Sequence, residues 1–233
     1  MNAETRDPGA RPPLRRPNVV AAFDVDKTLT THDCVVPFLR RVGGRRFLMR
    51  LAIRTPELAV AVLRRRRDRI KALATRAAVR GRRHDEIVDE ARSFADDVWE
   101  RWMRPDTVAR LRWHIEAGHR VVLVSASYRD YLEPLAERLG AHAVLSTELE
   151  VRNGICTGDL DGPNCRGSVK AERLRAWIAA QEMPGADIHA YGDSAGDRDL
   201  LALAHHPTLV GSSPIDVVPE SSLARIGSDE VPS

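Results

Sequence analysis

Cysteine is scarce in this sequence of 233 residues, and the three that occur lie far apart. Cys34, Cys156 and Cys165 form no C-x-x-C pair, and their number is odd. Disulfide frameworks and structural zinc sites both need paired cysteines, so this spacing argues against either class. Thiols that are not paired in this way are typical of a reducing compartment. We therefore expect a cytoplasmic protein.

Aromatic residues and long apolar runs are also few. Aromatic residues make up 5% of the sequence, against 43% hydrophobic and 30% charged residues. The most apolar-leaning segment, FLMRLAIRTPELAVAVL, is broken by Arg50, Arg54, Pro56 and Glu57, whereas a membrane-spanning helix needs about 20 consecutive apolar residues. Residues 1–17 carry no apolar stretch and are predicted to be a disordered tail rather than a secretory signal. The composition is that of a soluble globular protein.

Charge is unevenly distributed, although the net charge is only +3. Basic residues dominate 40–83, including the run RRRRDRIK, and acidic residues dominate 85–106. Such a basic region could contact an anionic membrane or a lipid-like phosphate. Two helices with solvated faces of opposite charge are the simpler interpretation. Nucleic acid is not favoured, because no aromatic residues are interleaved with the arginines to stack on bases.

The pattern of apolar residues divides the chain into an alternating part and a helical part. Predicted strands at 18–24, 119–127, 141–147, 186–193 and 207–212 alternate with helices, which indicates a parallel sheet covered on both faces. Asn153-Gly154 predicts a hairpin within 148–160. No strand pattern occurs between 32 and 103. We therefore expect a core of 18–31 and 104–222, a helical insert at 32–103, and loose tails at 1–17 and 223–233.

Chemically reactive side chains follow the predicted strands. The carboxyl ends of the strands form the binding edge of an open parallel sheet, so these side chains are expected to meet. A D-x-D pair alone is common in solvated turns, a serine at a strand end is usually a helix cap, and a first-turn lysine is usually solvated. Together, carboxylates, a hydroxyl and an ammonium are what phosphoryl transfer needs. In chain order they are Asp24, Asp26, Ser125 or Ser127, Lys170, Asp193 and Asp197.

Four stretches carry these residues: DVDKT at 24–28, VVLVSAS at 121–127, CRGSVK at 165–170 and YGDSAGD at 191–197. In this order the sequence resembles the haloacid-dehalogenase-like (HAD) hydrolases, subfamily IB, and within them the phosphoserine-phosphatase-like group. The resemblance extends from Val19 to Val210. It implies an α/β fold with a Rossmann-like, three-layer parallel sheet and a helical-bundle cap of the C1 type inserted after the first motif.

The resemblance also implies a role for each matching residue. Asp24 would be the nucleophile, forming an aspartyl-phosphate, and Asp26 would be the general acid and base. Mg²⁺ would be held by Asp24, the main-chain carbonyl of Asp26 and Asp193, with Asp197 in support. The phosphoryl group would be bound by Thr28, Ser125, Ala126 and Lys170. The implied activity is a Mg²⁺-dependent phosphatase acting on a small or lipid-like phosphate monoester.

Several positions depart from the phosphoserine-specific pattern. Lys27 stands where that group usually carries a small hydroxyl residue, and Ala126 and Ser127 replace a glycine pair. In the fourth motif Ser194 and Gly196 replace a glycine and an asparagine. The cap residues that bind the serine part of the substrate in those enzymes cannot be aligned with particular residues of this sequence, although Asp33 and the arginines of the insert are candidates. A phosphoserine phosphatase proper is therefore the alternative rather than the favoured prediction.

Two other functional classes fit less well. A receiver domain places its phosphorylated aspartate on a middle strand, whereas the D-x-D here follows the first strand. A non-catalytic anion-binding protein using the basic insert would be expected to lose some of its carboxylates, and all are present.

We interpret His205-His206 as favourable charge at a helix end rather than as a metal pair, and Cys165 as structural. The oligomeric state is not predicted.

Overall fold

The computed structural model of the chain describes residues 18–52, 55–64 and 66–218. The two expected tails, 1–17 and 223–233, lie outside these residues. A five-stranded sheet forms the centre of the molecule, with strand order β3-β2-β1-β6-β7 and every neighbouring pair parallel. Its strands are β1 (Val19–Phe23), β2 (Arg120–Tyr128), β3 (Ala143–Thr147), β6 (Asp187–Gly192) and β7 (His206–Leu209).

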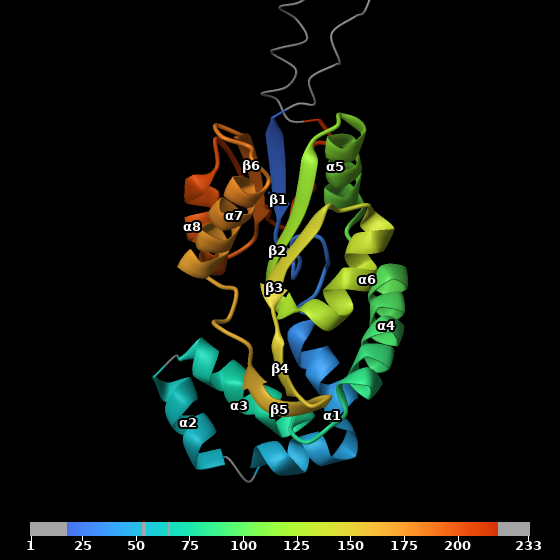
Figure 1. Cartoon of the computed structure of the whole chain (residues 1–233), viewed down its shortest axis with the longest axis vertical. Helices are drawn as coiled ribbons and strands as arrows, with labels where there is room; N and C mark the ends of the chain where they lie inside the picture. Colours follow the sequence, from blue (N-terminus) through green and yellow to red (C-terminus); the bar gives the residue numbers. More distant parts are fainter. Residues whose placement is uncertain (1–17, 53–54, 65, 219–233) are drawn as a thin grey trace, which may run out of the picture.

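Strand β1 shows how this sheet is buried on both faces. Ala21 and Phe23 belong to one hydrophobic cluster, and Val20 and Ala22 belong to the other. Successive side chains of a strand point to opposite faces, so a strand that is apolar at every position is stable only between two layers. The helices α5 (Pro105–Glu116) and α6 (Arg129–Leu139) cover one face, and α7 (Ser168–Ala180) and α8 (Arg198–Leu203) cover the other (Figure 1). This confirms the predicted three-layer α/β fold.

The segment after β1 is helical, as expected. It contains α1 (Val35–Ala52), α2 (Thr55–Leu63), α3 (Arg67–Val79) and α4 (His84–Arg101). Helices α1 to α3 lie beyond the carboxyl edge of the sheet, and α4 runs back beside α6 (Figure 1). The apolar stripe of α4 drives this packing, since Phe94 meets Tyr131 of α6 with ring centroids 5.2 Å apart. Within the described residues, no helix has the length and apolar character that crossing a membrane requires.

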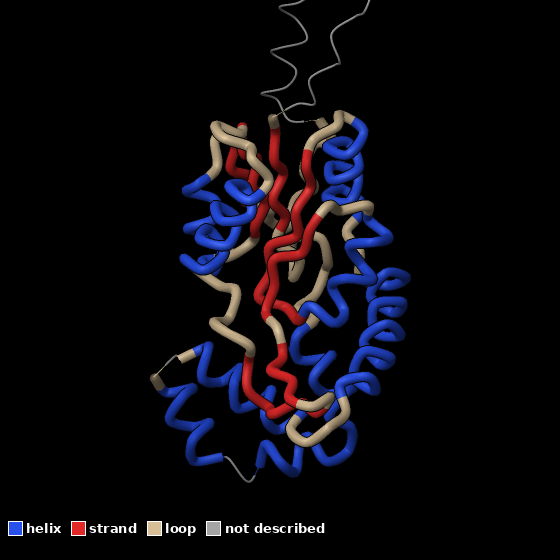
Figure 2. Tube along the Cα trace, in the orientation of Figure 1, coloured by secondary structure: helices blue, strands red, loops and turns tan. Residues whose placement is uncertain are grey.

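The predicted hairpin is present but packs outside the core. Strands β4 (Leu149–Arg152) and β5 (Ile155–Leu160) are joined by Asn153 and Gly154, both with positive φ, at 51° and 77°. Figure 2 shows this small sheet among the helices of the insert. Cys156 exchanges main-chain hydrogen bonds with the turn after α3, to Gly81 and Arg82, both 2.9 Å.

Residues 148–160, which were assigned to the core from the sequence, thus pack against α3 of the insert in this structure. Two strands alone are marginally stable in water, and α3 supplies the surface that covers them. Gly158, at φ 92°, lies against α3 so closely that a Cβ atom would meet Arg80 Cβ at 2.8 Å. The hairpin packs with the cap, although nothing in the local sequence pattern indicates its contact with α3.

The interpretation of His205-His206 as a helix end was also wrong. Helix α8 ends at Leu203, and His206 is the first residue of β7, opposite His189 of β6. Parallel pairing with β6 therefore outweighs the helical pattern of these last residues.

Candidate active site

The strand ends that carry the predicted residues meet at one edge of the sheet. The amide of Asp24 donates to the carbonyl of Tyr191 (2.9 Å), so the β1–β6 ladder continues to the first carboxylate. A cavity of about 160 Å³ opens there. Its lining includes six of the eight predicted site residues: Asp24, Asp26, Ala126, Lys170, Asp193 and Asp197.

A buried cation lies between two of these carboxylates. Lys170 Nζ is 2.5 Å from Asp24 Oδ1 and 2.5 Å from Asp197 Oδ1. The three residues are 2%, 5% and 1% exposed, respectively. Lys170 comes from the first turn of α7, and Asp197 from the short helical turn Ala195–Asp197 that precedes α8. Charges this deeply buried are tolerated only when they are paired and hydrogen-bonded.

The cluster carries more negative than positive charge. The pKa of Asp24 is raised to about 7: burial is the main cause, Lys170 opposes it, and Asp197 and Asp26 add to it. Burial lowers the pKa of Lys170, but the two carboxylates outweigh this and raise it overall. Burial and Asp197 also raise the pKa of Asp193. One ammonium therefore does not compensate the carboxylates, and a further cation at this position would be stabilised.

The donor set fits a hard divalent cation such as Mg²⁺. Asp24, Asp193 and Asp197 each offer a carboxylate oxygen, and these atoms lie within 4.8 Å of one another. Asp197 is already engaged, because its Oδ1 accepts from Lys170 and its Oδ2 accepts from Ser194 N (3.1 Å) and Ser194 Oγ (2.9 Å). Asp24 and Asp193 are thus better placed as direct ligands, with Asp197 in a supporting position.

We expect Mg²⁺ to stabilise the protein more at pH 8 than at pH 5. Because the pKa of Asp24 is raised from 3.8 to about 7 on folding, this group favours the folded metal-free protein below pH 4 and loses that contribution as pH rises through 7. Mg²⁺ needs the ionised carboxylate, so protons weaken its binding about 100-fold at pH 5. At saturating Mg²⁺ this is a difference of about 2.7 kcal/mol in stabilisation.

Thermal unfolding with and without Mg²⁺ at the two pH values measures this difference. Asp193→Asn should remove most of the shift at pH 8, and Asp161→Asn, an exposed carboxylate outside the cavity, should leave it unchanged. Equal Mg²⁺ shifts at both pH values would contradict the assignment of Asp24 to the metal.

Asp26 is held apart from the three-carboxylate cluster. Its Oδ1 accepts from Cys34 N (2.9 Å) and its Oδ2 accepts from Ser127 Oγ (2.5 Å). Burial and Asp33 raise its pKa, and the hydrogen bonds from Ser127 and Cys34 lower it. With its side chain fixed in this way, only its main-chain carbonyl remains for a metal. The carboxyl group is free of the Lys170 ion pair and can exchange a proton.

Two predicted phosphate-binding residues do not line the cavity. Ser125 is fully buried, and its Oγ accepts from Ser127 N (3.1 Å). Thr28 is also fully buried, and its Oγ1 donates to Asp24 Oδ2 at 3.5 Å. Both orient neighbouring groups of the site in this structure, and direct contact of either with a phosphoryl group stays a prediction. Ala126 does line the cavity.

The structure adds cationic residues to which the motifs assign no role. Arg67 of α3 and Arg166 line the cavity, together with Lys27 and Asp33. Lys27 is exposed and has a φ of 60°, a left-handed conformation that costs free energy in a residue with a side chain. Arg166 lies within the third motif and could have been noticed there. Arg67 belongs to the basic run that was interpreted as a solvated face.

Lys71 joins the cap to the edge of the sheet. Its Nζ donates to the carbonyl of Ala126, to Thr147 Oγ1 (3.0 Å) and to Asn164 Oδ1 (2.7 Å). Burial lowers the pKa of this lysine to about 7. Lys71 of α3 therefore binds both Ala126 of β2, which lines the cavity, and Asn164, which precedes the third motif residue Arg166. Nothing in the local sequence indicates these contacts.

Comparison with known proteins identifies relatives of this chain. The family model described as haloacid dehalogenase-like hydrolase matches residues 21–202. The chain is 37% identical over 190 residues to Protein CicA of Caulobacter vibrioides, and the aligned region covers 80% of this chain and 83% of that protein. It is 30% identical over 183 residues to phosphoserine phosphatase SerB2 of Mycobacterium tuberculosis, and this aligned region covers 78% of this chain and 41% of that protein.

Solved structures share the fold. A protein of unknown function from Bordetella pertussis Tohama I superposes with a TM-score of 0.65 at 24% identity, covering 91% of this chain and 95% of that chain. A phosphoserine phosphatase in its apo form superposes with a TM-score of 0.56 at 16% identity, covering 80% of this chain and 82% of that chain. At these identities the likeness concerns the fold alone.

Proposed function

The chain belongs to the haloacid dehalogenase-like hydrolase family, and from this premise we propose that it is a Mg²⁺-dependent phosphomonoester hydrolase that works through an aspartyl-phosphate. The observation that carries the proposal is the buried Asp24 carboxylate, which lines a cavity and is ion-paired with Lys170. A second carboxylate, Asp26, is held beside it by its own hydrogen bonds. The three buried, free cysteines are consistent with the cytoplasmic location that we expect.

Asp24 is the proposed nucleophile. Its Oδ1 contacts Lys170, and its other oxygen is contacted only weakly, by Thr28 Oγ1 at 3.5 Å. A carboxylate attacks phosphorus when it is positioned and when the negative charge of the phosphoryl group is neutralised. Lys170 supplies a buried positive charge at this point. When bound, Mg²⁺ would supply further neutralisation, held by Asp24, the main-chain carbonyl of Asp26 and Asp193, with Asp197 in support.

Asp26 is the proposed general acid and base. In the first step an Asp24 oxygen bonds to phosphorus, the ester P–O bond breaks, and the leaving alkoxide takes the proton of Asp26. In the second step Asp26 removes a proton from water, the water oxygen bonds to phosphorus, and the Asp24–phosphorus bond breaks to release inorganic phosphate. Asp26 then holds its proton again. Its raised pKa supports both roles.

Ser127 positions Asp26 and tunes its pKa. We expect Ser127→Ala to lower kcat about tenfold and to move the limb of the pH–rate profile that reports Asp26 upward by about one pH unit. The hydrogen bond from Ser127 lowers the pKa of Asp26, so its loss must raise that pKa, and a hydrogen bond to a charged group contributes about 1.5–3 kcal/mol.

Ser146→Ala is the matched control for this variant. Ser146 is also a buried serine near a strand end, and its Oγ has no hydrogen-bond partner within the described residues. This variant should keep the wild-type pH profile, and Ser127→Thr should restore the hydroxyl and most of the rate. A fall in kcat with an unmoved pH profile would show that Ser127 acts only through packing.

Asp33 and Arg67 of the insert line the cavity beside the catalytic carboxylates, so we expect the remainder of a substrate to contact the cap. Cationic groups from Lys27, Arg67 and Arg166 and the carboxylate of Asp33 surround this cavity. Phosphoserine itself remains the alternative substrate. A screen of phosphoserine, sugar phosphates, glycerol phosphate, lysophosphatidate and nucleotides, with Mg²⁺ and with chelator, tests the proposed activity. Hydrolysis of none of them in Mg²⁺ would contradict it.

One observation favours a lipid-like phosphate among these substrates. Leu63, the last residue of α2, is 84% exposed and directly precedes Arg64. Arg64 and Arg66 line a shallow cavity together with Val60 of α2, which is also exposed. Apolar side chains beside arginines are typical of surfaces that lie on anionic membranes. Arg67 of the same run lines the active-site cavity, so this surface adjoins the entrance.

We expect Arg64→Gln with Arg66→Gln to weaken binding to anionic vesicles roughly thirtyfold, since each arginine near such a surface contributes about 1 kcal/mol. Turnover of lysophosphatidate in those vesicles should fall with it, while turnover of p-nitrophenyl phosphate stays within twofold. Arg92→Gln, on the exposed side of α4, is the matched control. Unchanged vesicle binding would identify the basic run as a solvated face.

A further inference from the structure

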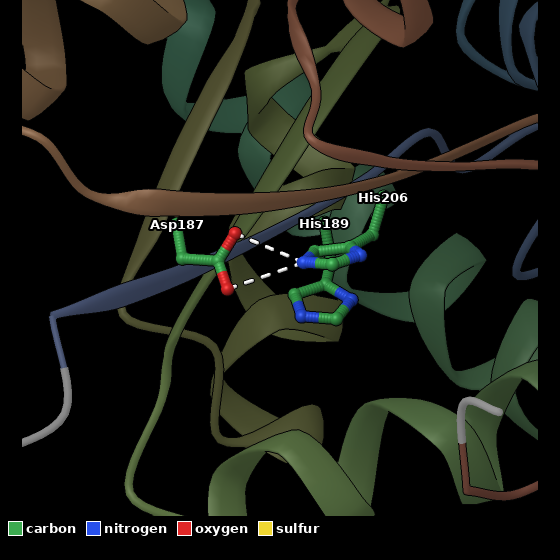
Figure 3. Close-up of side chains that lie close together, drawn as sticks. All are labelled: Asp187, His189 and His206. Carbon is green, nitrogen blue, oxygen red and sulfur yellow. Dashed lines mark hydrogen bonds and ion pairs between the residues drawn. The ribbon is translucent and has the colours of Figure 1, made fainter. Parts of the chain in front are cut away.

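A second cluster of metal-ligating side chains lies at the other end of strand β6. Asp187 and His189 occupy alternate positions of β6, and His206 begins the neighbouring strand β7 in register with His189 (Figure 3). Alternate residues of one strand share a face of the sheet. The parallel pairing of β6 with β7 therefore brings two imidazoles and one carboxylate together on a single face.

The three side chains are close enough to share one ion. Each offers a ligand atom, and these atoms lie within 4.8 Å of one another. His206 Nε2 is 3.0 Å from Asp187 Oδ1 and 3.2 Å from Asp187 Oδ2. The rings of His189 and His206 stack with their centroids 4.3 Å apart. Figure 3 shows the Asp187 carboxylate directed at His206, with the His189 ring beside it.

An ion pair between Asp187 and His206 does not explain why His189 lies beside them. A partly exposed pair of this kind contributes little to stability, and it gives no reason for His189 to face it. His189 is 4% exposed, whereas Asp187 and His206 reach solvent. The cluster therefore has a buried ligand at its base and two ligands at its mouth, through which an ion could enter.

The chemistry of the cluster differs from that of the active site. Imidazole nitrogens favour Zn²⁺, Ni²⁺, Cu²⁺ or Co²⁺ over Mg²⁺, whereas the carboxylates around Asp24 favour Mg²⁺. Two imidazoles and a carboxylate leave a fourth tetrahedral position for water.

Three further histidines lie near this cluster, and their contacts differ from those of His189 and His206. His119 stacks near His189 at 6.2 Å, but His114 and His119 are hydrogen-bonded to each other through their Nδ1 atoms (2.8 Å). The remaining ring nitrogen of His114 is bonded to Tyr191 Oη (2.8 Å). The Nδ1 of His205 accepts from the amide of Ile188 at 3.0 Å. His114 thus has both ring nitrogens engaged, and His119 and His205 have one each. Within the described residues, the ligand atoms that lie within 4.8 Å of one another here are those of Asp187, His189 and His206.

We propose that Asp187, His189 and His206 form a binding site for one transition-metal ion of the Zn²⁺ type, which clamps the edge strand β7 to β6. The site lies at the amino end of β6, and the active-site carboxylate Asp193 follows its carboxyl end. Asp193 is four residues beyond His189 and six beyond Asp187, which corresponds to roughly 13–20 Å along a strand. The site is therefore separate from the active site, and the proposal does not depend on the proposed phosphatase activity.

Titration of the metal-free chain with Co²⁺ and with Zn²⁺, in excess Mg²⁺ to occupy the active-site oxygens, tests this proposal. We expect one Co²⁺ per chain with the visible absorption of a nitrogen-ligated, low-coordinate ion, displaced by Zn²⁺. His206→Ala should weaken binding at least about 100-fold, since even an outer-shell partner of a metal ligand contributes 10- to 100-fold. His206 is partly exposed, so this variant should fold, which circular dichroism checks.

Two further variants make the result decisive. His205→Ala removes the adjacent imidazole of the same dipeptide and should leave Co²⁺ binding within about threefold. Asp193→Asn removes a carboxylate of the active site and should leave the absorption band unchanged. Binding that survives in folded His206→Ala, or that is lost in Asp193→Asn, would overturn the proposal. So would the failure of the wild-type chain to show a nitrogen-ligated band.

Discussion

Asp24→Asn is expected to reduce turnover of p-nitrophenyl phosphate in Mg²⁺ buffer by at least about 10⁴-fold, because a carboxamide cannot form the acyl phosphate. Removal of a nucleophile has effects of this size where it has been measured in hydrolases. The change is nearly isosteric, and the variant keeps the ion pair between Lys170 and Asp197. Activity within about a hundredfold of wild type would rule out Asp24 as the nucleophile.

The stability of the same variant separates chemistry from folding. The pKa of Asp24 is raised to about 7, so the ionised carboxylate destabilises the folded metal-free protein at pH 8. We expect Asp24→Asn to be at least as stable as wild type at pH 8 without metal, and to lose stabilisation by Mg²⁺. Asp33→Asn is the control, since Asp33 is an exposed carboxylate of the same cavity, and its kcat for the aryl phosphate should stay within about tenfold.

Lys170→Met is expected to have the largest effect on stability and an effect of at least about 10³-fold on turnover. Lys170 is the cation between the buried carboxylates of Asp24 and Asp197. Breaking a buried ion pair by removing one partner costs about 3–5 kcal/mol. Lys170 lowers the pKa of Asp24, so this pKa rises further in the variant, and the loss of stability grows as pH increases from 5 to 8.

Denaturant unfolding at pH 5 and pH 8 measures this loss of stability. The double variant Asp24→Asn with Lys170→Met closes a mutant cycle, and we expect it to recover much of the stability lost in Lys170→Met because only Asp197 then remains charged. Activity stays absent in the double variant. A Lys170→Met protein that is equally destabilised at both pH values would show that Lys170 acts through packing rather than charge.

Much of this site could be predicted from the sequence because its members stand at strand ends or in the first turn of a helix. A buried strand has a local signature, visible in the unbroken apolar run before Asp24. The topology of parallel sheets then brings the residues that follow each strand to one edge. Asp24, Asp26, Ala126, Lys170, Asp193 and Asp197 were placed at one cavity by this reasoning and by the motifs they belong to. The Asn153-Gly154 hairpin was predicted for a similarly local reason, its turn conformation.

Contacts between distant segments were not predictable in this way. Ser127 and Asp26 are 101 residues apart, and Lys71 and Asn164 are 93 residues apart. Ser127 and Asp26 meet because β1 pairs with β2, and Lys71 meets Asn164 because the insert folds over the sheet. The hairpin packs on α3 rather than on the core for the same reason, since its own sequence specifies the turn but not the surface that covers it.

The sequence by itself thus determined the fold class, the order of the motifs and the chemical groups at the end of each strand, because periodicity and turn propensity act over a few residues. The tertiary structure alone decided which side chains touch. It placed the Arg67 and Lys71 side chains at the active-site edge and His206 beside His189 and Asp187. Strand register and helix packing are properties of the whole chain, since they depend on burying apolar surface that is contributed by distant segments.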